Sequence, residues 1–406
     1  MNRNGTAQLD ALSNEASLGY ESDAVGIYVH IPYCVAKCPY CDFNSVAAAS
    51  WPEDRYVEAL KRELRYYREW PVFQSARVAT IFFGGGTPSL FAAHSLGSIL
   101  SEIAKLWPIE PQAEVTIEAN PGTVDLTKLQ AFRAAGINRI SFGVQSFDES
   151  NLKLLGRIHS GEDAVVSVEA AFSAGFDNVN VDLIYALPGQ TVNSWHRDLV
   201  RACALVPTHI SPYNLTYEEG TPFYAWRRQG RFVPVDDETE IAMFQLAEEV
   251  LGAHGYYRYE ISNYAKPLFI CRHNLGYWSS RPYVGVGAGA HGYSPRGGKH
   301  HWGVRWANEK SPTRYMESVQ SRGHARQMLE DISEQQAAAE FVFLALRCVE
   351  GVDARAFQGR FGTRLEEKFP CITDLAAKGL LEQTTLGWRL TPRGTMLADS
   401  VFAEFF

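Results

Sequence analysis

From residue 25 onward, short apolar and β-branched runs alternate along the chain with longer amphipathic segments. The short runs begin near Val25, Val78, Glu114, Arg139, Val179 and His209. Most of them are almost continuously apolar, as expected for strands that are covered on both faces. Between the first two runs, Tyr56, Leu60, Leu64 and Tyr67 recur at three- and four-residue steps, which predicts an amphipathic helix from about residue 53 to residue 70. This alternation predicts parallel βαβ units.

Six units of this kind are two fewer than a complete eight-stranded barrel has. The pattern therefore predicts an α/β fold built as a partial (β/α)6 barrel. Polar residues follow the predicted strands at Gly84 to Thr87, Glu118, Gln145, Asp182 and Tyr213 to Thr216. Because chemistry in parallel α/β folds lies beyond the carboxyl ends of the strands, we expect these residues to share a pocket.

The pattern changes after about residue 255. Residues 256–310 are rich in glycine, tyrosine and histidine and predict an irregular, packed linking segment. Residues 311–406 predict a smaller, helical, winged-helix-like domain, in which Ser333 and Gln336 form a capping box for one helix. We expect residues 23–255 to form the barrel and residues 1–22 a disordered N-terminal tail.

Charge and hydropathy narrow the class of protein. The 38 basic and 46 acidic residues give a net charge of -8, which argues against a general nucleic-acid binder. No apolar run approaches the roughly 20 residues that span a bilayer. The first 22 residues resemble neither a secretory signal nor a transit peptide. We expect a cytoplasmic protein, and the sequence leaves transient association with a membrane surface and the oligomeric state open.

The placement of the cysteines is the unusual feature of the composition. Of seven cysteines, Cys34, Cys38 and Cys41 form a C-x3-C-x2-C motif directly after the first predicted strand. Thiolates at this spacing can surround one metal centre. A structural zinc site needs four ligands and would have to borrow Cys271 or a histidine, whereas a 4Fe-4S cluster held by three thiolates leaves one iron open. The spacing favours the iron-sulfur cluster and leaves zinc as the alternative.

These motifs resemble the radical S-adenosylmethionine (SAM) superfamily, in which such a cysteine loop precedes a glycine motif after the second strand. More closely, YVHIPYCVAKCPYC, FFGGGTPSL, IEANP, SFGVQSF and DLIYALPGQT resemble the family of oxygen-independent coproporphyrinogen III oxidase and its haem-chaperone relatives. The resemblance runs from about Val25 into the C-terminal domain. It implies that the three cysteines bind a 4Fe-4S cluster whose open iron is occupied by SAM. The positions that match SAM contacts are Tyr28, Tyr40, Gly85, Gly86, Thr87, Glu118, Gln145, Arg157, Asp182 and Thr216.

Three features distinguish the haem-chaperone branch from the oxidase. The oxidase pattern has a fourth cysteine where this chain has Phe43, and only 33 residues precede Cys34 here, whereas the oxidase has a longer N-terminal segment. The HNLGYW segment also resembles the HNxxYW motif of the chaperone branch. It offers a candidate haem site of His273, Asn274, Tyr277 and Trp278. From residue chemistry alone, the same four residues favour a buried cluster that packs the barrel against the C-terminal domain, and the resemblance to the motif reverses this preference.

The resemblance therefore implies a haem chaperone that carries a SAM-coordinated cluster and passes haem to an acceptor protein such as a respiratory enzyme. The alternative is a radical SAM oxidoreductase that decarboxylates a porphyrinogen. A zinc-stabilised nucleic-acid-binding protein is a third option, which the acidic charge disfavours.

Overall fold

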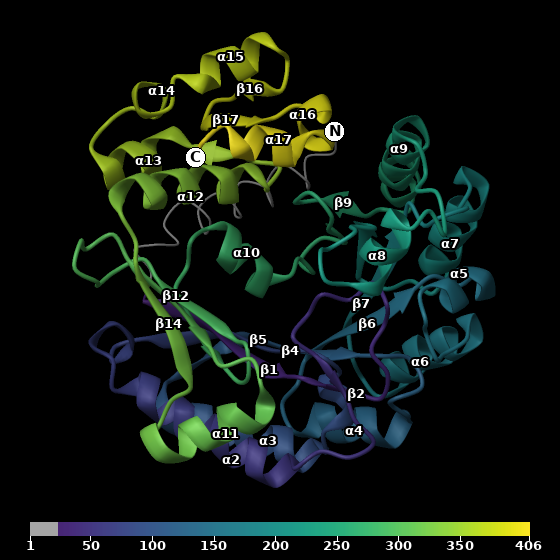
Figure 1. Cartoon of the computed structure of the whole chain (residues 1–406), viewed down its shortest axis with the longest axis vertical. Coiled ribbons are helices and arrows are strands. Elements are labelled where there is room, and N and C mark those ends of the chain that lie inside the picture. Colours follow the sequence, from purple (N-terminus) through teal and green to yellow (C-terminus); the bar gives the residue numbers. More distant parts are fainter. Residues whose placement is uncertain (1–22) are drawn as a thin grey trace.

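A parallel sheet of six strands forms the body of the protein in the computed structural model, which describes residues 23–406 (Figure 1). The expected N-terminal tail, residues 1–22, lies outside the described residues. The strands are β1 (Ala24–Ile31), β4 (Arg77–Gly85), β5 (Ile109–Ala119), β6 (Arg139–Gln145), β7 (Asn178–Tyr185) and β8 (His209–Asn214). They are parallel neighbours in that order. The predicted partial (β/α)6 barrel is confirmed.

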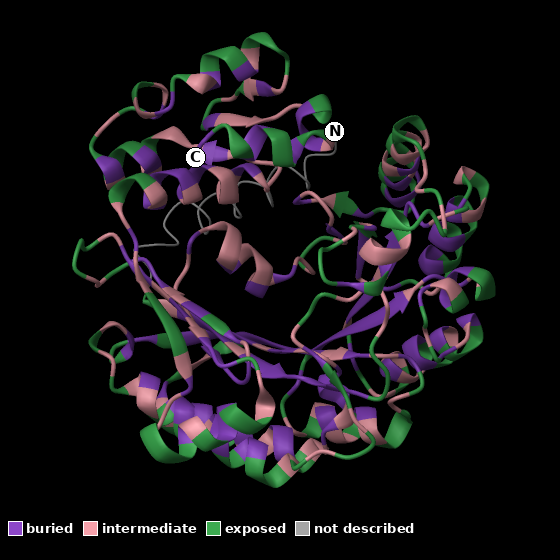
Figure 2. Cartoon of the chain, in the orientation of Figure 1, coloured by how far each residue is buried: buried purple, intermediate pink, exposed green. Residues whose placement is uncertain are grey.

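Helices cover the outer face of this sheet. They are α2 (Glu53–Arg68), α3 (Ala93–Leu106), α4 (Leu126–Ala134), α6 (Gly161–Ser173), α7 (Val192–Ala204) and α9 (Asp237–Ala253). The short helices α5 (Glu149–Leu154) and α8 (Pro222–Arg228) lie in the connections after β6 and β8, and Phe223 of α8 packs against Tyr40 of the cysteine loop. On α2, Tyr56, Leu60, Leu64 and Tyr67 are completely buried, so the predicted amphipathic helix is confirmed. Figure 2 shows the buried residues concentrated in the sheet and on the helix faces that pack against it. Short 3-10 turns occur at η1 (Pro71–Phe73) and η2 (Pro88–Leu90).

The segment expected to be an irregular loop instead extends the sheet at both edges. Strand β11 (Tyr283–Val286) lies parallel to β1, and β12 (His291–Ser294) and β13 (Val304–Asn308) continue the sheet antiparallel. Strand β14 (Arg326–Asp331), from the part of the chain expected to be helical, adds the last strand at this edge. At the other edge, β10 (Tyr264–Ala265) and β9 (Tyr257–Arg258) follow β8. One glycine shows why the stretch is glycine-rich. A Cβ on Gly285 would lie 1.7 Å from the carbonyl oxygen of His291, so only glycine permits this close return of the chain.

The HNLGYW segment forms the short helix α10 (Arg272–Trp278). It lies between the sheet and the C-terminal unit (Figure 1) and contacts both β4 and α12 (Glu334–Leu346). The sequence pattern did not predict this helix, because seven residues span only about two turns and give no clear apolar period.

The two largest of the hydrophobic clusters in residues 23–406 divide this part of the chain into two units. The first contains buried residues from Val25 to Ala325, including those of β11, β13 and α11 (Pro312–Arg322), and the second contains buried residues from Ile332 to Phe405. The C-terminal unit comprises α12, α13 (Ala354–Phe361), α14 (Leu365–Lys368), α15 (Cys371–Ala377), α16 (Pro392–Met396), α17 (Ala398–Ala403) and a small sheet of β15 (Val352–Asp353), β17 (Gly387–Leu390) and β16 (Leu381–Gln383). We therefore propose a boundary near residue 331, later in the chain than the expected one at residue 311.

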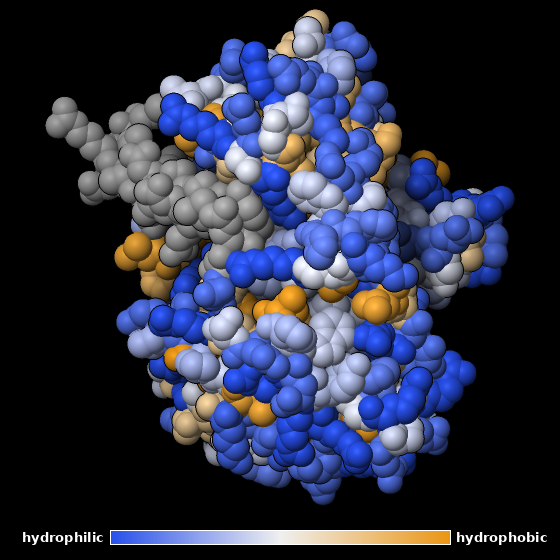
Figure 3. All heavy atoms as spheres, turned by 90° about the vertical axis from the view of Figure 1, so that its left-hand side faces the viewer, coloured by the Kyte–Doolittle hydropathy of each residue, from blue (hydrophilic) through white to orange (hydrophobic). Residues whose placement is uncertain are grey.

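Local signals in the C-terminal unit behave as the sequence predicts. Ser333 and Gln336 form the expected capping box at the start of α12. Within residues 23–406, no helix has the length and hydrophobicity that crossing a membrane requires. On the face shown in Figure 3, hydrophobic residues lie in separate spots among hydrophilic ones.

Candidate functional site

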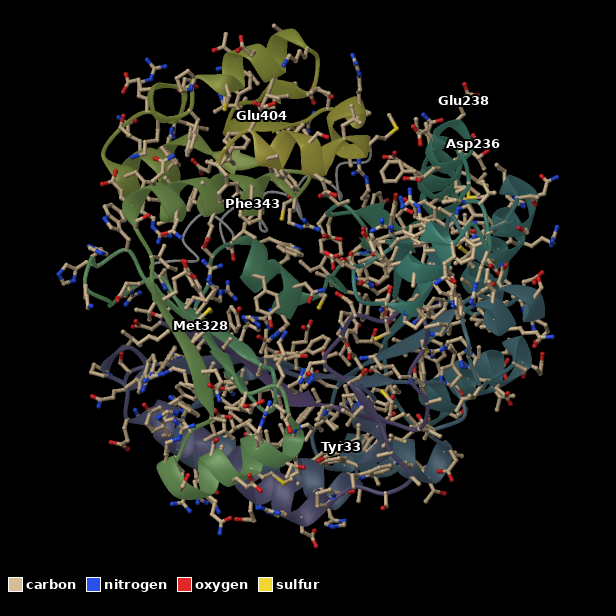
Figure 4. The ribbon with its side chains drawn as sticks, viewed as in Figure 1. Tyr33, Asp236, Glu238, Met328, Phe343 and Glu404 are labelled. Carbon is tan, nitrogen blue, oxygen red and sulfur yellow. The ribbon has the colours of Figure 1, made fainter. Side chains whose placement is uncertain are left out.

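A cavity of about 980 Å³ opens at the carboxyl ends of the parallel strands. Its walls come from the barrel strands, the cysteine loop after β1, helix α10 and the end of the C-terminal unit at Thr395 to Ser400. Side chains from the strands and from α10 crowd the centre of the molecule in Figure 4. Both structural units therefore contribute to one site.

The three cysteines of the C-x3-C-x2-C motif line this cavity. Cys34 ends the short strand β2 (Tyr33–Cys34), which pairs with β3 (Val46–Ala47), and Cys38 and Cys41 follow in the loop. Burial raises the pKa of the Cys34 and Cys41 thiols above the ordinary value. All three are free thiols.

Two polar side chains donate hydrogen bonds to these sulfurs. The Thr87 hydroxyl lies 3.5 Å from Cys34 Sγ, and Arg157 Nη1 lies 3.4 Å from Cys38 Sγ. Among residues 23–406, no three or more His, Cys, Asp or Glu side chains are arranged as a ready metal site. The thiols thus share one cavity without forming a closed ligand set. Their donor chemistry, three sulfurs with neighbouring donors that stabilise thiolates, fits an iron-sulfur cluster.

The zinc alternative finds no fourth ligand in Cys271. This thiol is buried and faces Glu114 Oε1 at 3.7 Å, and it is not among the described residues that line the cavity. Burial raises the pKa of Cys271 to about 12, which keeps the thiol protonated.

Every residue that matches a SAM contact also lines the cavity. These residues are Tyr28, Tyr40, Gly85, Gly86, Thr87, Glu118, Gln145, Arg157, Asp182 and Thr216. They come from the carboxyl halves of the strands and from the loops that follow them, which is where the sequence places them. The structure therefore brings together all ten of these positions and the three cysteines.

Two buried carboxyl groups face this part of the cavity. Burial is the main cause that raises the pKa of Glu118 to about 7; the backbone N–H of Gly85, 3.0 Å from Glu118 Oε2, opposes the rise, and the charge of Asp182 adds to it. Burial also raises the pKa of Asp182, although Ser141 and Asn180 donate hydrogen bonds to it. A bound ammonium group or ribose hydroxyls would stabilise the ionised forms of both acids.

Gln145 and Arg157 show further signs of a binding site. Gln145 has φ 69°, in the left-handed region that non-glycine residues rarely adopt, and its Oε1 is buried without a hydrogen-bond partner. Arg157 Nη2 donates to Asn120 Oδ1 at 2.6 Å and to the carbonyl of Gly143 at 2.7 Å. Arg157 is therefore held rigidly beside Cys38, while Gln145 keeps an acceptor for a ligand.

The candidate haem residues are divided between two cavities. His273, Asn274 and Tyr277 line the main cavity, whereas Trp278 lines a smaller one between α10 and α12. The Arg347 guanidinium lies 4.4 Å from the centroid of the Trp278 ring. The structure thus brings three of the four residues together and turns the fourth away.

His273 is buried and has partners for both ring nitrogens. Nδ1 is 2.7 Å from the Thr80 hydroxyl, Nε2 is 2.8 Å from the Tyr277 hydroxyl, and the ring stacks on Phe82 with centroids 5.1 Å apart. Burial and the nearby charge of Arg139 lower the pKa of His273 to about 3. In this arrangement the imidazole is neutral and packed, as the alternative interpretation of the motif predicts.

The sequence did not predict a further group of polar side chains inside the barrel. His209 is hydrogen-bonded to Asn180 at 2.6 Å and to the Tyr259 hydroxyl at 2.8 Å, and Asn180 donates to Asp182 at 2.8 Å. Arg139 lines the same cavity. These residues are polar members of otherwise apolar strand runs, at every second position. That alternation is a signal that they face the barrel interior.

Two family models match the chain. Residues 28–201 match the model described as the radical SAM superfamily, and residues 332–397 match the HemN C-terminal domain. Among solved structures, the chain is similar to coproporphyrinogen III oxidase (HemN) from Escherichia coli, with a TM-score of 0.80 and 23% identity over 96% of this chain and 92% of that one. At that identity the likeness establishes the fold.

Two proteins have a higher sequence identity to this chain than the oxidase has. The chain is 36% identical to the heme chaperone HemW of Bacillus subtilis over 93% of this chain and 98% of the relative. It is also 36% identical to the heme chaperone HemW of Escherichia coli, over 94% of this chain and 98% of the relative.

Proposed function

We propose that this chain binds haem and delivers it to an acceptor protein such as a respiratory enzyme. The chain belongs to the HemW haem-chaperone family of the radical SAM superfamily, and the proposal starts from that membership. The observation that carries the proposal is the continuity of the cavity. A single space of about 980 Å³ runs from the cysteine loop to α10 and the C-terminal unit. It offers room for a large, flat ligand beside the SAM-contact residues. We also propose a cytoplasmic location, where thiols stay reduced.

The resident cofactors follow from the family and from the residues present. Cys34, Cys38 and Cys41 would hold a 4Fe-4S cluster, and the ten SAM-contact positions, Glu118 and Asp182 among them, would hold SAM. A cluster bound by three thiolates supplies one iron that is open to a small molecule. The chain's own contribution is to stabilise the thiolates through Thr87 and Arg157 and to place buried carboxyl groups opposite a cationic ligand.

Phe43 favours a chaperone over an oxidase. This residue stands where the oxidase pattern has another cysteine; it lines the cavity and its side chain is 62% exposed. A phenyl ring cannot ligate iron, but it provides an apolar surface against which a porphyrin can pack.

The HNLGYW segment would form one wall of the haem site. His273, Asn274 and Tyr277 line the cavity, and the Nε2 of His273 lies 2.8 Å from the Tyr277 hydroxyl. For His273 to bind iron, its Nε2 would first have to exchange the Tyr277 hydroxyl for the metal. We therefore propose this segment, with Trp278 as its packed end, as a wall of the site and leave the identity of the iron ligand to experiment.

The proposed function is tested by assaying the protein for porphyrinogen decarboxylation and for haem binding. Anaerobically reconstituted protein is incubated with coproporphyrinogen III, SAM and a reductant, and the porphyrins are separated by chromatography. We expect no decarboxylated product, while a parallel sample binds haem. A mature HemN-type oxidase serves as the positive control. Catalytic formation of the decarboxylated porphyrinogen by this chain would instead assign it to the radical oxidoreductases.

A further inference from the structure

Arg139 is a buried cation inside the barrel, and neither the cluster site nor the SAM-contact positions include it. It is the first residue of β6, its side chain is 2% exposed, and it lines the main cavity. Burial tends to lower the pKa of its guanidinium, but the charges of nearby acidic side chains, Glu114 and Asp182 among them, outweigh this effect and raise the pKa above the ordinary value. The group therefore remains charged.

The guanidinium of Arg139 lacks partners within the described chain. Its Nε is buried without a hydrogen bond, and no side-chain hydrogen bond or ion pair within residues 23–406 involves it. A buried guanidinium normally has its donors satisfied, because an unpartnered buried charge is costly. The combination of an unpartnered guanidinium with a position in the cavity wall is the observation that points to a ligand.

The neighbouring carboxylates are already occupied. Glu114 accepts hydrogen bonds from the backbone N–H groups of Arg272 and His273, each at 3.0 Å. Asp182 accepts from Ser141 and Asn180. Both acids balance the charge of Arg139 at longer range and leave its donors free.

The other two arginines that line the cavity are committed. Arg157 donates to Asn120, Gly143 and Cys38, as described above. Arg347 lies over the rings of Trp278 and Phe402. Of these three arginines, Arg139 is the one whose guanidinium has neither a hydrogen bond, an ion pair nor an aromatic ring against it within residues 23–406.

We propose that Arg139 is the anchor for a carboxylate of the large ligand that enters the cavity. A guanidinium presents its donors in a planar fork that matches a carboxylate in a bidentate arrangement. This assignment rests on the proposed function: if the ligand is haem, the carboxylate that Arg139 binds is one of the haem propionates. Arg139 thereby fixes the depth and orientation of the porphyrin in the barrel.

The test compares haem with its dimethyl ester, in which both propionates are blocked, in titrations of the full-length protein in the same buffer and detergent. The wild type should bind haem at least about tenfold more tightly than the ester. Arg139→Gln should lose that preference, and Arg139→Lys should keep part of it, because lysine retains the charge without the planar fork. Arg133→Gln is the matched control, since Arg133 lies on α4 and bonds the carbonyl of Ile137 outside the cavity.

Each outcome separates this inference from the proposed function. If the wild type binds haem and its ester equally well, water satisfies the guanidinium and the propionate anchor is wrong, although haem binding stands. The same conclusion follows if Arg139→Gln retains the full preference. If Arg139→Gln does not fold, Arg139→Lys carries the test, and a full preference for haem in that variant would also overturn the anchor. If the wild type binds neither compound, the proposed function fails and the anchor fails with it.

Discussion

Each cysteine of the loop experiences a different combination of burial and hydrogen bonding. Thr87 donates to Cys34, the Arg157 guanidinium donates to Cys38, and the backbone near Phe43 lowers the pKa of Cys41 against the stronger effect of burial. Cys203, by contrast, lies on α7 in the apolar core, where burial raises its pKa to about 11. Only the loop cysteines combine access to the cavity with donors that stabilise a thiolate.

Removing one loop sulfur should abolish the cluster. Anaerobically reconstituted wild-type protein should contain about four iron atoms per chain, and Cys38→Ala should lose most of this iron because two thiolates cannot hold the cluster. Cys203→Ala should retain it. Iron and sulfide analysis together with the visible absorption spectrum measure the effect. Stoichiometric zinc without iron in the wild type would overturn the assignment.

The sequence correctly predicted residues of the cavity where a polar residue ends an apolar run. Glu118 and Gln145 stand at such ends and line the cavity; Asp182 also lines it, but it lies within β7 and is followed there by three more residues, Leu183 to Tyr185. Arg139 and His209 stand at the beginnings of their runs, where a charged or polar residue is normally read as a surface position. The closure of the sheet shows that these side chains point inward, and in the sequence only their alternation with apolar residues distinguishes them from solvent-facing positions.

At the scale of elements, α10 depends on a side chain from another element. Its seven residues are too few for independent stability, and its N-cap residue, Cys271, makes no side-chain capping bond. Glu114 on β5 replaces the cap by accepting hydrogen bonds from two backbone N–H groups at the start of the helix. The negative charge of the Glu114 carboxylate also stabilises α10, because the amino-terminal end of a helix carries a partial positive charge.

Glu114→Ala should therefore destabilise the protein and disturb α10. We expect a loss of about 1–3 kcal/mol in the free energy of unfolding, because two charge-assisted hydrogen bonds disappear in a buried site. Glu110→Ala on the same strand is the control. Its 3.9 Å contact with Arg272 is partly exposed and should be worth less than about 1 kcal/mol. Denaturant unfolding of both variants checks the difference. Equal stabilities would show that α10 is held by packing alone.

The sequence predicted the long elements better than the short ones. The barrel strands and α2 are long enough for their periods to be read, whereas β11, β12 and β13 have only four or five residues each. The position of such short strands depends on pairing with β1 and with one another, which is a long-range interaction. Helix α10 depends on Glu114, some 160 residues earlier in the chain.

At the scale of the whole molecule, the cavity belongs to neither unit alone. The barrel supplies the cysteine loop and the polar strand ends, and the C-terminal unit supplies Arg347 and the segment from Thr395 to Ser400. Sequence reasoning predicted both units but could not predict that they enclose one space, because no motif spans them.

Haem binding by the cluster-loaded protein tests the account most directly. The full-length chain is reconstituted under anaerobic conditions and titrated with haem, with and without SAM, while the haem and cluster absorption bands are followed together. The account predicts saturable, stoichiometric haem binding with the cluster retained. Protein that carries its cluster and binds SAM but takes up no haem saturably would contradict it.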